Sequence, residues 1–407
     1  MKIITPHYIM LRDRVVANLS VAYDKQIEKI APIDELVALY PDAKITTLRE
    51  HSLLMPGLIN AHVHIEFSKN KTELTYGDFL NWLYSVIENR ADLINDCDVN
   101  CMGKAIDKML ANGITTFGAI SSHAMDLEAC AKAKQNVIFF NELIGSQADM
   151  ADALYQDFLE RVTASKAVER ENFHAGVAIH SPYSVHPILV KRAVEIAKNE
   201  KLPLTAHFME SIAEREWLDE SRGDFKPFFK ELLKQDKRIS SAEEFLSYFE
   251  GSDALLTHVT NATESELDFI AKNKLKVIHC PISNRLLGNP TLDLEALDKK
   301  NIRWIVATDG LSSNYDLDLF EEMKISLFMH DKAPLSTLAQ SLLEGVTVRA
   351  AEALGLNTGV IEEGKNADML VVDLESEPTK DLALHLILHR YNISKVFVNG
   401  NLEVGEL

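Results

Sequence analysis

The segment Leu58–Phe67 reads LINAHVHIEF and carries two histidines, separated by one valine, at the end of a hydrophobic run. Alternate side chains of a β-strand point to the same side, so His62 and His64 are expected to lie next to each other. Paired imidazoles at the end of a strand are suited to binding a metal ion. Such a pair needs further ligands from other parts of the chain.

Short apolar runs rich in β-branched residues alternate along the chain with longer stretches of helical period. Eight such runs fall between Leu54 and Asn314. Eight repeats of strand and helix predict an α/β fold, a (β/α)8 TIM barrel. An open, doubly wound sheet is the competing arrangement. The runs are LLMPGLINAHVH, GITTFGAI, NVIFFNELIG, FHAGVAIHSP, LPLTAHFME, ALLTHVTN, LKVIHCPISN and IRWIVATDGLSSN.

The two ends of the chain differ from its middle. They contain short strand-like runs with Gly and Asn turns, and after residue 355 the first long helix is expected only at about Leu382–His389. We therefore expect residues 1–53 and 356–407 to form a small β-sandwich domain. Residues 54–355 are expected to form the metal-dependent catalytic barrel.

Composition narrows the class of protein. The 407 residues carry a formal net charge of -19, with 46% hydrophobic and 25% charged residues. An acidic globular protein of this kind disfavours nucleic acid and anionic membranes as partners. The start, MKIITPHYIMLRDR, has no signal-peptide core, and no stretch approaches the roughly 20 apolar residues of a membrane span, so a cytoplasmic location is expected. The four cysteines are expected to be reduced thiols: Cys97, Cys101, Cys130 and Cys280.

Polar residues follow the predicted strands in a consistent way. In a TIM barrel the active site lies at the carboxyl ends of the strands. A lone histidine there is usually a packed or hydrogen-bonded residue, but many converging imidazole and carboxyl groups would repel or stay unsatisfied without a metal or a substrate. The groups at these strand ends are His62, His64, His180, His207, Glu210, His258, His279 and Asp309.

Three histidines and one carboxylate suit one divalent ion, zinc or iron. The predicted ligands are His62, His64, His207 and Asp309. Such a metal lowers the pKa of a bound water toward about 7 and so supplies a nucleophile. Asp309 can also take the proton of that water. Glu210 is expected one helical turn from His207, close enough to carry protons.

Taken together, these motifs resemble the amidohydrolase superfamily, in its branch of nucleoside deaminases, guanine deaminases and chlorohydrolases. The resemblance covers nearly the whole chain. The segments that carry it are PGLINAHVH at 56–64, HFME at 207–210, HCPISN at 279–284, TDGLSSN at 308–314 and GVIEEGKNADMLVVD at 359–373.

The resemblance implies a role for each matching residue. His62, His64, His207 and Asp309 would bind the metal, and Glu210 would protonate the substrate ring and shuttle protons. His258 would orient the water or the intermediate, and Asp309 would act in catalysis as well. Binuclear members often have a modified lysine after the fourth strand, whereas FHAGVAIH ends here in a histidine. This difference implies a single metal.

Within this branch the chain is most similar to deaminases of adenine nucleosides. The resemblance implies that Glu88, in SVIENR, holds the ribose hydroxyls and that His180, in HSPY, contacts the substrate. Neighbouring polar residues such as Ser283, Asn284 and Ser313 are expected to be structural hydrogen bonders. Family members are often dimers, so a homodimer is one expected state.

The residues after the third predicted strand distinguish between the possible substrates. Relatives that bind homocysteine adducts have an arginine there, whereas this chain reads FFNELIGSQAD. The chain looks more like the aminofutalosine deaminases of menaquinone biosynthesis, which convert 6-amino-6-deoxyfutalosine to the hypoxanthine product and ammonia. Ser146 is then expected to contact the substrate tail. The alternatives are an S-adenosylhomocysteine or methylthioadenosine deaminase and a triazine-type chlorohydrolase; an inactive relative and an amide hydrolase rank lower.

Overall fold

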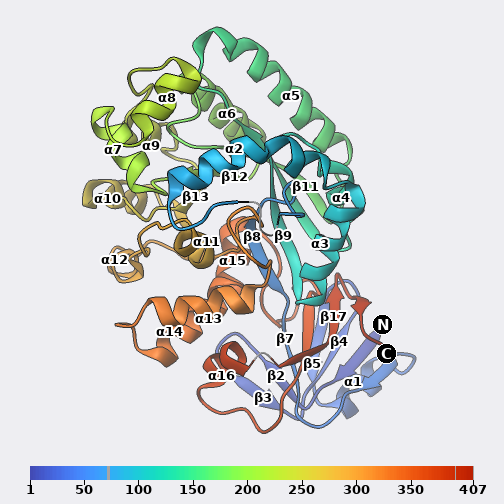
Figure 1. The fold of residues 1–407 in the computed structure, drawn as a ribbon. Coiled ribbons are helices and arrows are strands. Elements are labelled where there is room, and N and C mark those ends of the chain that lie inside the picture. The colour runs from blue at the N-terminus through green and yellow to red at the C-terminus, as the bar shows by residue number, and fades with distance from the viewer. Residues whose placement is uncertain (71–73, 390, 407) are drawn as a thin grey trace.

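The alternating runs form eight parallel strands in a computed structural model that describes residues 1–70, 74–389 and 391–406 (Figure 1). Each strand pairs with its neighbour in the sequence, and the backbone N–H of Asp309 donates to the carbonyl of His62 at 3.1 Å, next to the two edge strands. The predicted TIM barrel is confirmed. Its strands are β8 (Leu58–Val63), β9 (Ile114–Ser121), β10 (Asn136–Leu143), β11 (Phe173–Ile179), β12 (Leu204–Phe208), β13 (Leu255–His258), β14 (Lys276–His279) and β15 (Trp304–Val306).

Helices surround the strands, as Figure 1 shows. Several begin with a capping side chain, for example Asp98, whose carboxylate accepts the N–H of Cys101 at 2.8 Å. The helices are α2 (Phe79–Asn95), α3 (Val99–Ala111), α4 (Leu127–Lys132), α5 (Ala151–Ala167), α6 (Pro187–Glu200), α7 (Ile212–Glu220), α8 (Phe225–Leu233), α9 (Ala242–Tyr248), α10 (Glu264–Lys272), α11 (Pro281–Leu286), α12 (Leu294–Lys299), α13 (Leu319–Met329), α14 (Leu335–Gly345) and α15 (Val348–Leu354).

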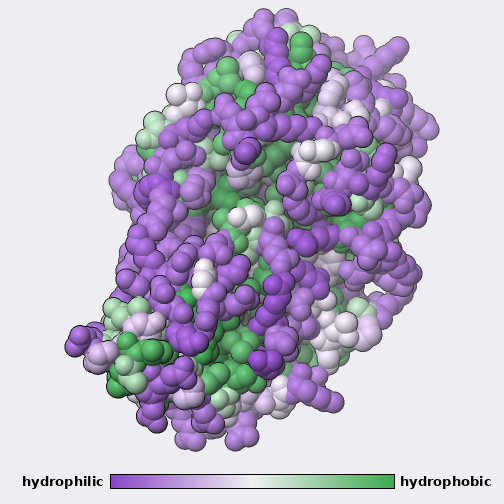
Figure 2. All heavy atoms as spheres, turned by 180° about the vertical axis from the view of Figure 1, so that it is seen from behind, coloured by the Kyte–Doolittle hydropathy of each residue, from purple (hydrophilic) through white to green (hydrophobic). Residues whose placement is uncertain are grey.

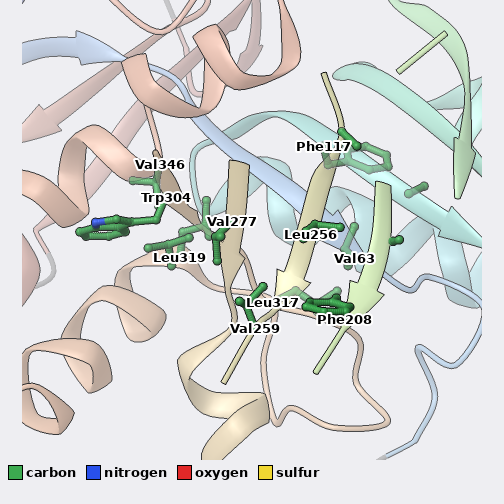
Figure 3. Close-up of a cluster of buried hydrophobic side chains, with 14 of the residues drawn as sticks. Val63, Phe117, Phe208, Leu256, Val259, Val277, Trp304, Leu317, Leu319 and Val346 are labelled. Carbon is green, nitrogen blue, oxygen red and sulfur yellow. The ribbon is translucent and has the colours of Figure 1, made fainter. Parts of the chain in front are cut away.

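Two buried clusters hold the barrel together. The outer cluster lies between strands and helices and includes Val63, Phe208 and Trp304 (Figure 3). The inner cluster fills the barrel with Ile59, Ala61 and their counterparts on other strands. Strands that are apolar on both faces are typical of a parallel sheet covered by helices.

A change of register in β8 points the two histidines of the first strand the same way. Ile59 and Ala61 belong to the inner cluster, but Val63 belongs to the outer one. The pairing of β8 with β9 shifts between Asn60 and Val63, which is a β-bulge. The bulge changes which alternate residues face the barrel, so His62 and His64 face its interior end.

Gly57 divides the first predicted strand into two. The preceding strand β7 (Ser52–Pro56) pairs with the antiparallel strand β16 (Met369–Asp373), outside the barrel. A Cβ at Gly57 would lie 2.1 Å from the hydroxyl oxygen of Thr115, so the close approach to β9 requires glycine.

The two ends of the chain form two sheets, and both termini lie in this part of the molecule (Figure 1). Ile4 and Tyr23 of one sheet pack against Met369 and Phe397 of the other, so the predicted β-sandwich is confirmed. The assignment of residues 1–53 and 356–407 to a separate domain stays a prediction. The first sheet is β5 (Ile27–Ala31), β4 (Ser20–Tyr23), β1 (Lys2–Thr5) and β6 (Lys44–Thr47); the second is β18 (Asn401–Val404), β17 (Asn392–Val398), β16, β7, β2 (Tyr8–Met10) and β3 (Val15–Ala17). Two short helices, α1 (Ile33–Leu39) and α16 (Leu382–His389), accompany them.

The expectation of four reduced thiols is wrong for two of them. Cys97 and Cys101 form a disulfide, with their Cα atoms 5.2 Å apart. Cys97 lies just before α3 rather than within it, so the first turn of that helix brings Cys101 beside it. Cys130 and Cys280 are free and buried.

One face of the molecule shows how polar and apolar residues divide on the surface. The face seen in Figure 2 is mostly hydrophilic, with hydrophobic atoms gathered in smaller patches. In the described part of the chain, no helix is both long and apolar enough to cross a membrane.

Candidate active site

Three histidines meet at the carboxyl ends of the barrel strands. Ring nitrogens of His62, His64 and His207 lie within 4.8 Å of one another. His62 is fully buried, and its Nε2 has no hydrogen-bond partner among the described residues. A buried nitrogen lone pair without a partner is unfavourable unless a ligand uses it. This donor set therefore fits a divalent metal ion.

Asp309 joins these histidines from the other side of the barrel. Its Oδ1 lies 3.6 Å from His62 Nε2 and 3.5 Å from His64 Nε2. Its Oδ2 accepts hydrogen bonds from the hydroxyls of Ser283 and Ser313, both at 2.7 Å. Burial alone would raise the pKa of Asp309, but the imidazoles of His62 and His64 lower it below its ordinary value. These contacts favour the carboxylate, which is the form that binds a metal.

Hydrogen bonds to the second ring nitrogen orient the histidines. Thr257 Oγ1 lies 3.2 Å from His62 Nδ1, and the carbonyl oxygen of His180 lies 2.7 Å from His207 Nδ1. Burial lowers the pKa of His64, and burial and the neighbouring rings lower that of His207 well below its ordinary value. Both rings are neutral at physiological pH, as metal ligands must be.

Glu210 reaches the site by a turn and not by a helix, so its expected position one helical turn from His207 is wrong. His207 lies in strand β12, and Met209 adopts a positive φ of 51° between the two residues. Glu210 is only 7% exposed. Burial, followed by the carboxylates of Asp309 and Glu214, raises the pKa of Glu210 well above its ordinary value. A protonated carboxyl group can serve as a general acid.

Glu214 holds the turn that presents Glu210. Its two carboxylate oxygens accept the backbone N–H groups of Met209 at 3.0 Å and of Glu210 at 2.7 Å. Glu214 is fully buried, at the start of α7. These two bonds stabilise a left-handed backbone conformation that a residue other than glycine adopts only at a cost of about 1–3 kcal/mol.

Replacing Glu214 with alanine is expected to lower the free energy of unfolding by about 2–6 kcal/mol, because two buried N–H groups lose their partners at about 1–3 kcal/mol each. Urea denaturation measures the loss. The matched control is Glu220→Ala on the exposed surface of the same helix, expected to change stability by no more than about 0.5 kcal/mol. Equal losses in the two variants would contradict this role of Glu214.

His258 ends strand β13 and faces Glu210. Its Nε2 lies 3.5 Å from Glu210 Oε1, and its Nδ1 lies 2.8 Å from Asn284 Oδ1. Burial lowers the pKa of His258 to about 4, so the ring is neutral near pH 7. Its φ is 76°, and that of Asp309 is 59°. Unusual backbone angles therefore recur at Met209, His258 and Asp309, where chains leave the barrel strands, and such strain is common at functional sites.

The expected substrate-contacting residues surround this centre at different distances. The ring of His180 lies 5.3 Å from that of His207, with its Nδ1 2.6 Å from Ser184 Oγ. Ser146 is buried in the loop after β10, next to Gly145, which pairs with the loop after β11. No contact joins Ser146 to the histidines in the described residues.

Glu88 lies exposed on α2. Trp82 Nε1 of this helix donates to the carbonyl of Ser312 at 2.8 Å, and Arg90 lies 2.7 Å from His123 Nε2. Helix α2 thus runs from the loop after β15 to the loop after β9, which places Glu88 at the rim of the barrel.

His279 does not join the three clustered histidines. Its Nε2 lies 3.2 Å from that of His330, at the end of α13. Ser283, Asn284 and Ser313 are hydrogen bonders as expected, and their partners are the site residues Asp309 and His258.

Glu142 is a buried charged residue that sequence reasoning did not assign. It lies near the end of β10, and its Oε1 is 3.7 Å from His207 Nδ1. The only signal in the sequence is a charged residue within the apolar run NVIFFNELIG. It also forms a second group of potential ligand atoms, with His180 and His207.

Comparisons with known proteins agree with this geometry. Residues 53–402 match the amidohydrolase family. The chain is 47% identical over its full length to an aminodeoxyfutalosine deaminase from a Nitratiruptor species, all of which is covered. It is 34% identical to an adenosine deaminase from Helicobacter pylori, over 95% of each chain.

A solved structure matches the fold closely. The crystal structure of Helicobacter pylori aminofutalosine deaminase in complex with methylthio-coformycin superposes with a TM-score of 0.93 and 32% identity, covering 99% of this chain and 100% of the other. A zinc-bound adenosine deaminase from Xanthomonas campestris, 22% identical with a TM-score of 0.82, shares the fold. The matched family region includes the barrel, the three clustered histidines and Asp309, and the chain belongs to the amidohydrolase family.

Proposed function

We propose that this protein is a metal-dependent hydrolytic deaminase that acts on the adenine of 6-amino-6-deoxyfutalosine, giving the hypoxanthine product and ammonia. The observation that carries the proposal is the 47% identity, over both full chains, to an aminodeoxyfutalosine deaminase. The similar Helicobacter pylori structure is that of an aminofutalosine deaminase in complex with methylthio-coformycin. The reaction belongs to menaquinone biosynthesis.

His62, His64, His207 and Asp309 would hold one divalent ion, zinc or iron. Such an ion acidifies a coordinated water and so supplies the nucleophile at neutral pH. Asp309, whose Oδ2 is fixed by two serine hydroxyls, is placed to accept the proton of that water.

Glu210 would give a proton to the ring nitrogen next to the carbon that carries the amine. Burial and the carboxylates of Asp309 and Glu214 raise the pKa of Glu210 well above its ordinary value, which favours the protonated form. His258, neutral and oriented by Asn284, would hold the attacking oxygen in place. The amine would then take the proton held by Asp309 and leave as ammonia, while the hydroxyl proton on the same carbon returns to Glu210 and the carbonyl of the hypoxanthine product forms.

The adenosine part would be held by Glu88 and His180, and Ser146 would contact the substituent at the ribose 5′ position. Two observations support this arrangement. The ring of His180 is in contact distance of the metal site, and α2 places Glu88 at the rim. Neither residue is required for the metal site itself, so their replacement is expected to raise KM more than it lowers kcat.

The test is a comparison of kcat/KM across 6-amino-6-deoxyfutalosine, methylthioadenosine, S-adenosylhomocysteine and adenosine, measured by the absorbance change from adenine to hypoxanthine. Guanine is included and is measured by the release of ammonia. We expect the highest value for 6-amino-6-deoxyfutalosine, by at least about tenfold, which corresponds to about 1.4 kcal/mol of transition-state binding. Similar values for all adenosine derivatives would instead indicate a general deaminase of 5′-modified adenosines. Absence of activity on every adenine compound would refute the proposal.

A further inference from the structure

The carboxylate of Glu142 is fixed beside the histidine cluster but is not among the predicted ligands. Its Oε2 accepts a hydrogen bond from the hydroxyl of Ser122 at 2.6 Å. Arg161 donates to the backbone carbonyl of Glu142 at 3.0 Å and so holds the end of β10. The side chain of Glu142 is 0% exposed. Its position is therefore set by the protein and not by solvent.

The second carboxylate oxygen lacks a donor. Glu142 Oε1 accepts no hydrogen bond from the residues that the structure describes. A buried carboxylate oxygen without a donor is unfavourable, and its presence needs an explanation. It faces the ring of His207, whose Nδ1 is 3.7 Å away. A ring nitrogen of His180 also lies within 4.8 Å of the Glu142 carboxylate.

The surroundings of His207 Nδ1 determine which ring nitrogen carries the proton. The nitrogen lies 2.7 Å from the carbonyl oxygen of His180 and 3.7 Å from Glu142 Oε1. Both neighbours are acceptors that cannot donate, so Nδ1 carries the hydrogen and Nε2 keeps its lone pair. The group formed by Glu142, His180 and His207 is consequently not a second metal site, because Nδ1 of the shared histidine is already used.

The carboxylate of Glu142 would also affect the net charge of the metal site. A divalent ion with three neutral histidines and the Asp309 carboxylate leaves one net positive charge in a buried site. The Glu142 carboxylate neutralises that charge, and an unbalanced buried charge is strongly unfavourable. Metal-bound histidines commonly have a carboxylate or a carbonyl near their second nitrogen for these reasons.

We propose that Glu142 is a positioning residue for the metal site: it fixes the ring of His207 with the proton on Nδ1 and balances the charge of the bound ion. The inference rests on the proposed role of His207 as a ligand. It does not depend on which nucleoside the enzyme deaminates, so a test based on metal affinity separates the two proposals.

The experiment measures the zinc dissociation constant of the full chain by competition with a chromophoric chelator. Glu142→Gln keeps the shape of the side chain and an oxygen that can accept from Ser122, but removes the charge. We expect its zinc dissociation constant to rise by about 10- to 100-fold. The thermal midpoint of the metal-free variant is expected not to fall, because the replaced oxygen has no donor in the described part of the fold.

The matched control is Asp126→Asn. Asp126 is also fully buried, accepts a serine hydroxyl (Ser121 Oγ, at 2.6 Å) and has one oxygen without a partner among the described residues. Burial and the Glu66 carboxylate raise the pKa of Asp126 well above its ordinary value, which favours the neutral acid. We expect zinc affinity to stay within about twofold of that of the natural chain.

Two results would overturn the proposal: an unchanged zinc affinity in Glu142→Gln, or an equal loss of zinc affinity in Asp126→Asn. If Glu142→Gln does not fold, the zinc affinity of Glu142→Asp tests the proposal instead. This variant keeps the negative charge but places it farther from His207, because the aspartate side chain is one methylene group shorter. Intermediate zinc affinity would support the proposal, and natural affinity would refute it.

Discussion

Replacing Glu210 with glutamine is expected to lower kcat by about 10²- to 10⁴-fold, the usual contribution of a positioned general acid. Glutamine has nearly the same shape but cannot give or take the proton. The side chain is buried, and Nε2 of His258 lies 3.5 Å from its Oε1. Steady-state rates and zinc content of the variant measure the effect. Because Glu210 is not a predicted ligand, zinc content should not change, and a variant that loses zinc with its activity would contradict the assignment.

The pH profile tests the same residue independently. Burial, Asp309 and Glu214 raise the pKa of Glu210 well above its ordinary value. In the proposed mechanism the neutral form of Glu210 donates a proton, so activity is expected below the raised pKa and is expected to be lost as the pH rises through it. We expect kcat/KM of the natural chain to fall on the basic side, and this limb to disappear in Glu210→Gln. A basic limb that is the same in both proteins would show that another group controls it.

Replacing Asp309 with asparagine is expected to lower kcat/KM by at least about 10⁴-fold. In the proposed mechanism the variant loses a charged metal ligand, worth several kcal/mol, and the proton acceptor, worth about 10²- to 10⁴-fold in rate. Its Oδ2 accepts two serine hydroxyls, and an amide nitrogen at that position cannot do so. Zinc content and single-turnover rates separate loss of metal from loss of proton transfer.

Asp316→Asn is the matched control for this variant. Asp316 follows in the same loop, but its partly buried carboxylate pairs with the exposed Lys108 at 2.6 Å and accepts the backbone N–H of Leu317 at 2.7 Å. An ion pair with one exposed partner contributes about 1 kcal/mol. We expect kcat/KM within about twofold of that of the natural chain, and a large loss in Asp316→Asn would indicate that the whole loop, and not Asp309, sets the activity.

The barrel could be predicted because its strands repeat a simple pattern. Eight apolar runs separated by helical stretches have few other arrangements, and polar residues at their ends must lie at one rim. The position of His62, His64 and Asp309 at the carboxyl ends of the strands can therefore be predicted from the sequence. The strands β7 and β8 belong to different sheets, and the Pro56–Gly57 pair in LLMPGLINAHVH is the turn signal that could have marked the break between them.

The fine geometry of the site depends on features that no periodicity encodes. The bulge in β8 decides which residues face the barrel, and the positive φ of Met209 carries Glu210 to His258 without a helix. Glu142 was not predicted, since one charged residue in an apolar run is as consistent with a strand edge as with a buried site. Its role follows only when its distance to His207 is known.

The most direct measurement is a titration of zinc into metal-free protein, with ammonia and the hypoxanthine product quantified from 6-amino-6-deoxyfutalosine at each step. The proposed site predicts that both products appear in equal amounts and that the rate rises in proportion to bound zinc up to one ion per chain. A rate that requires two ions per chain, or hypoxanthine product formed equally well without any metal, would contradict a single-metal deaminase.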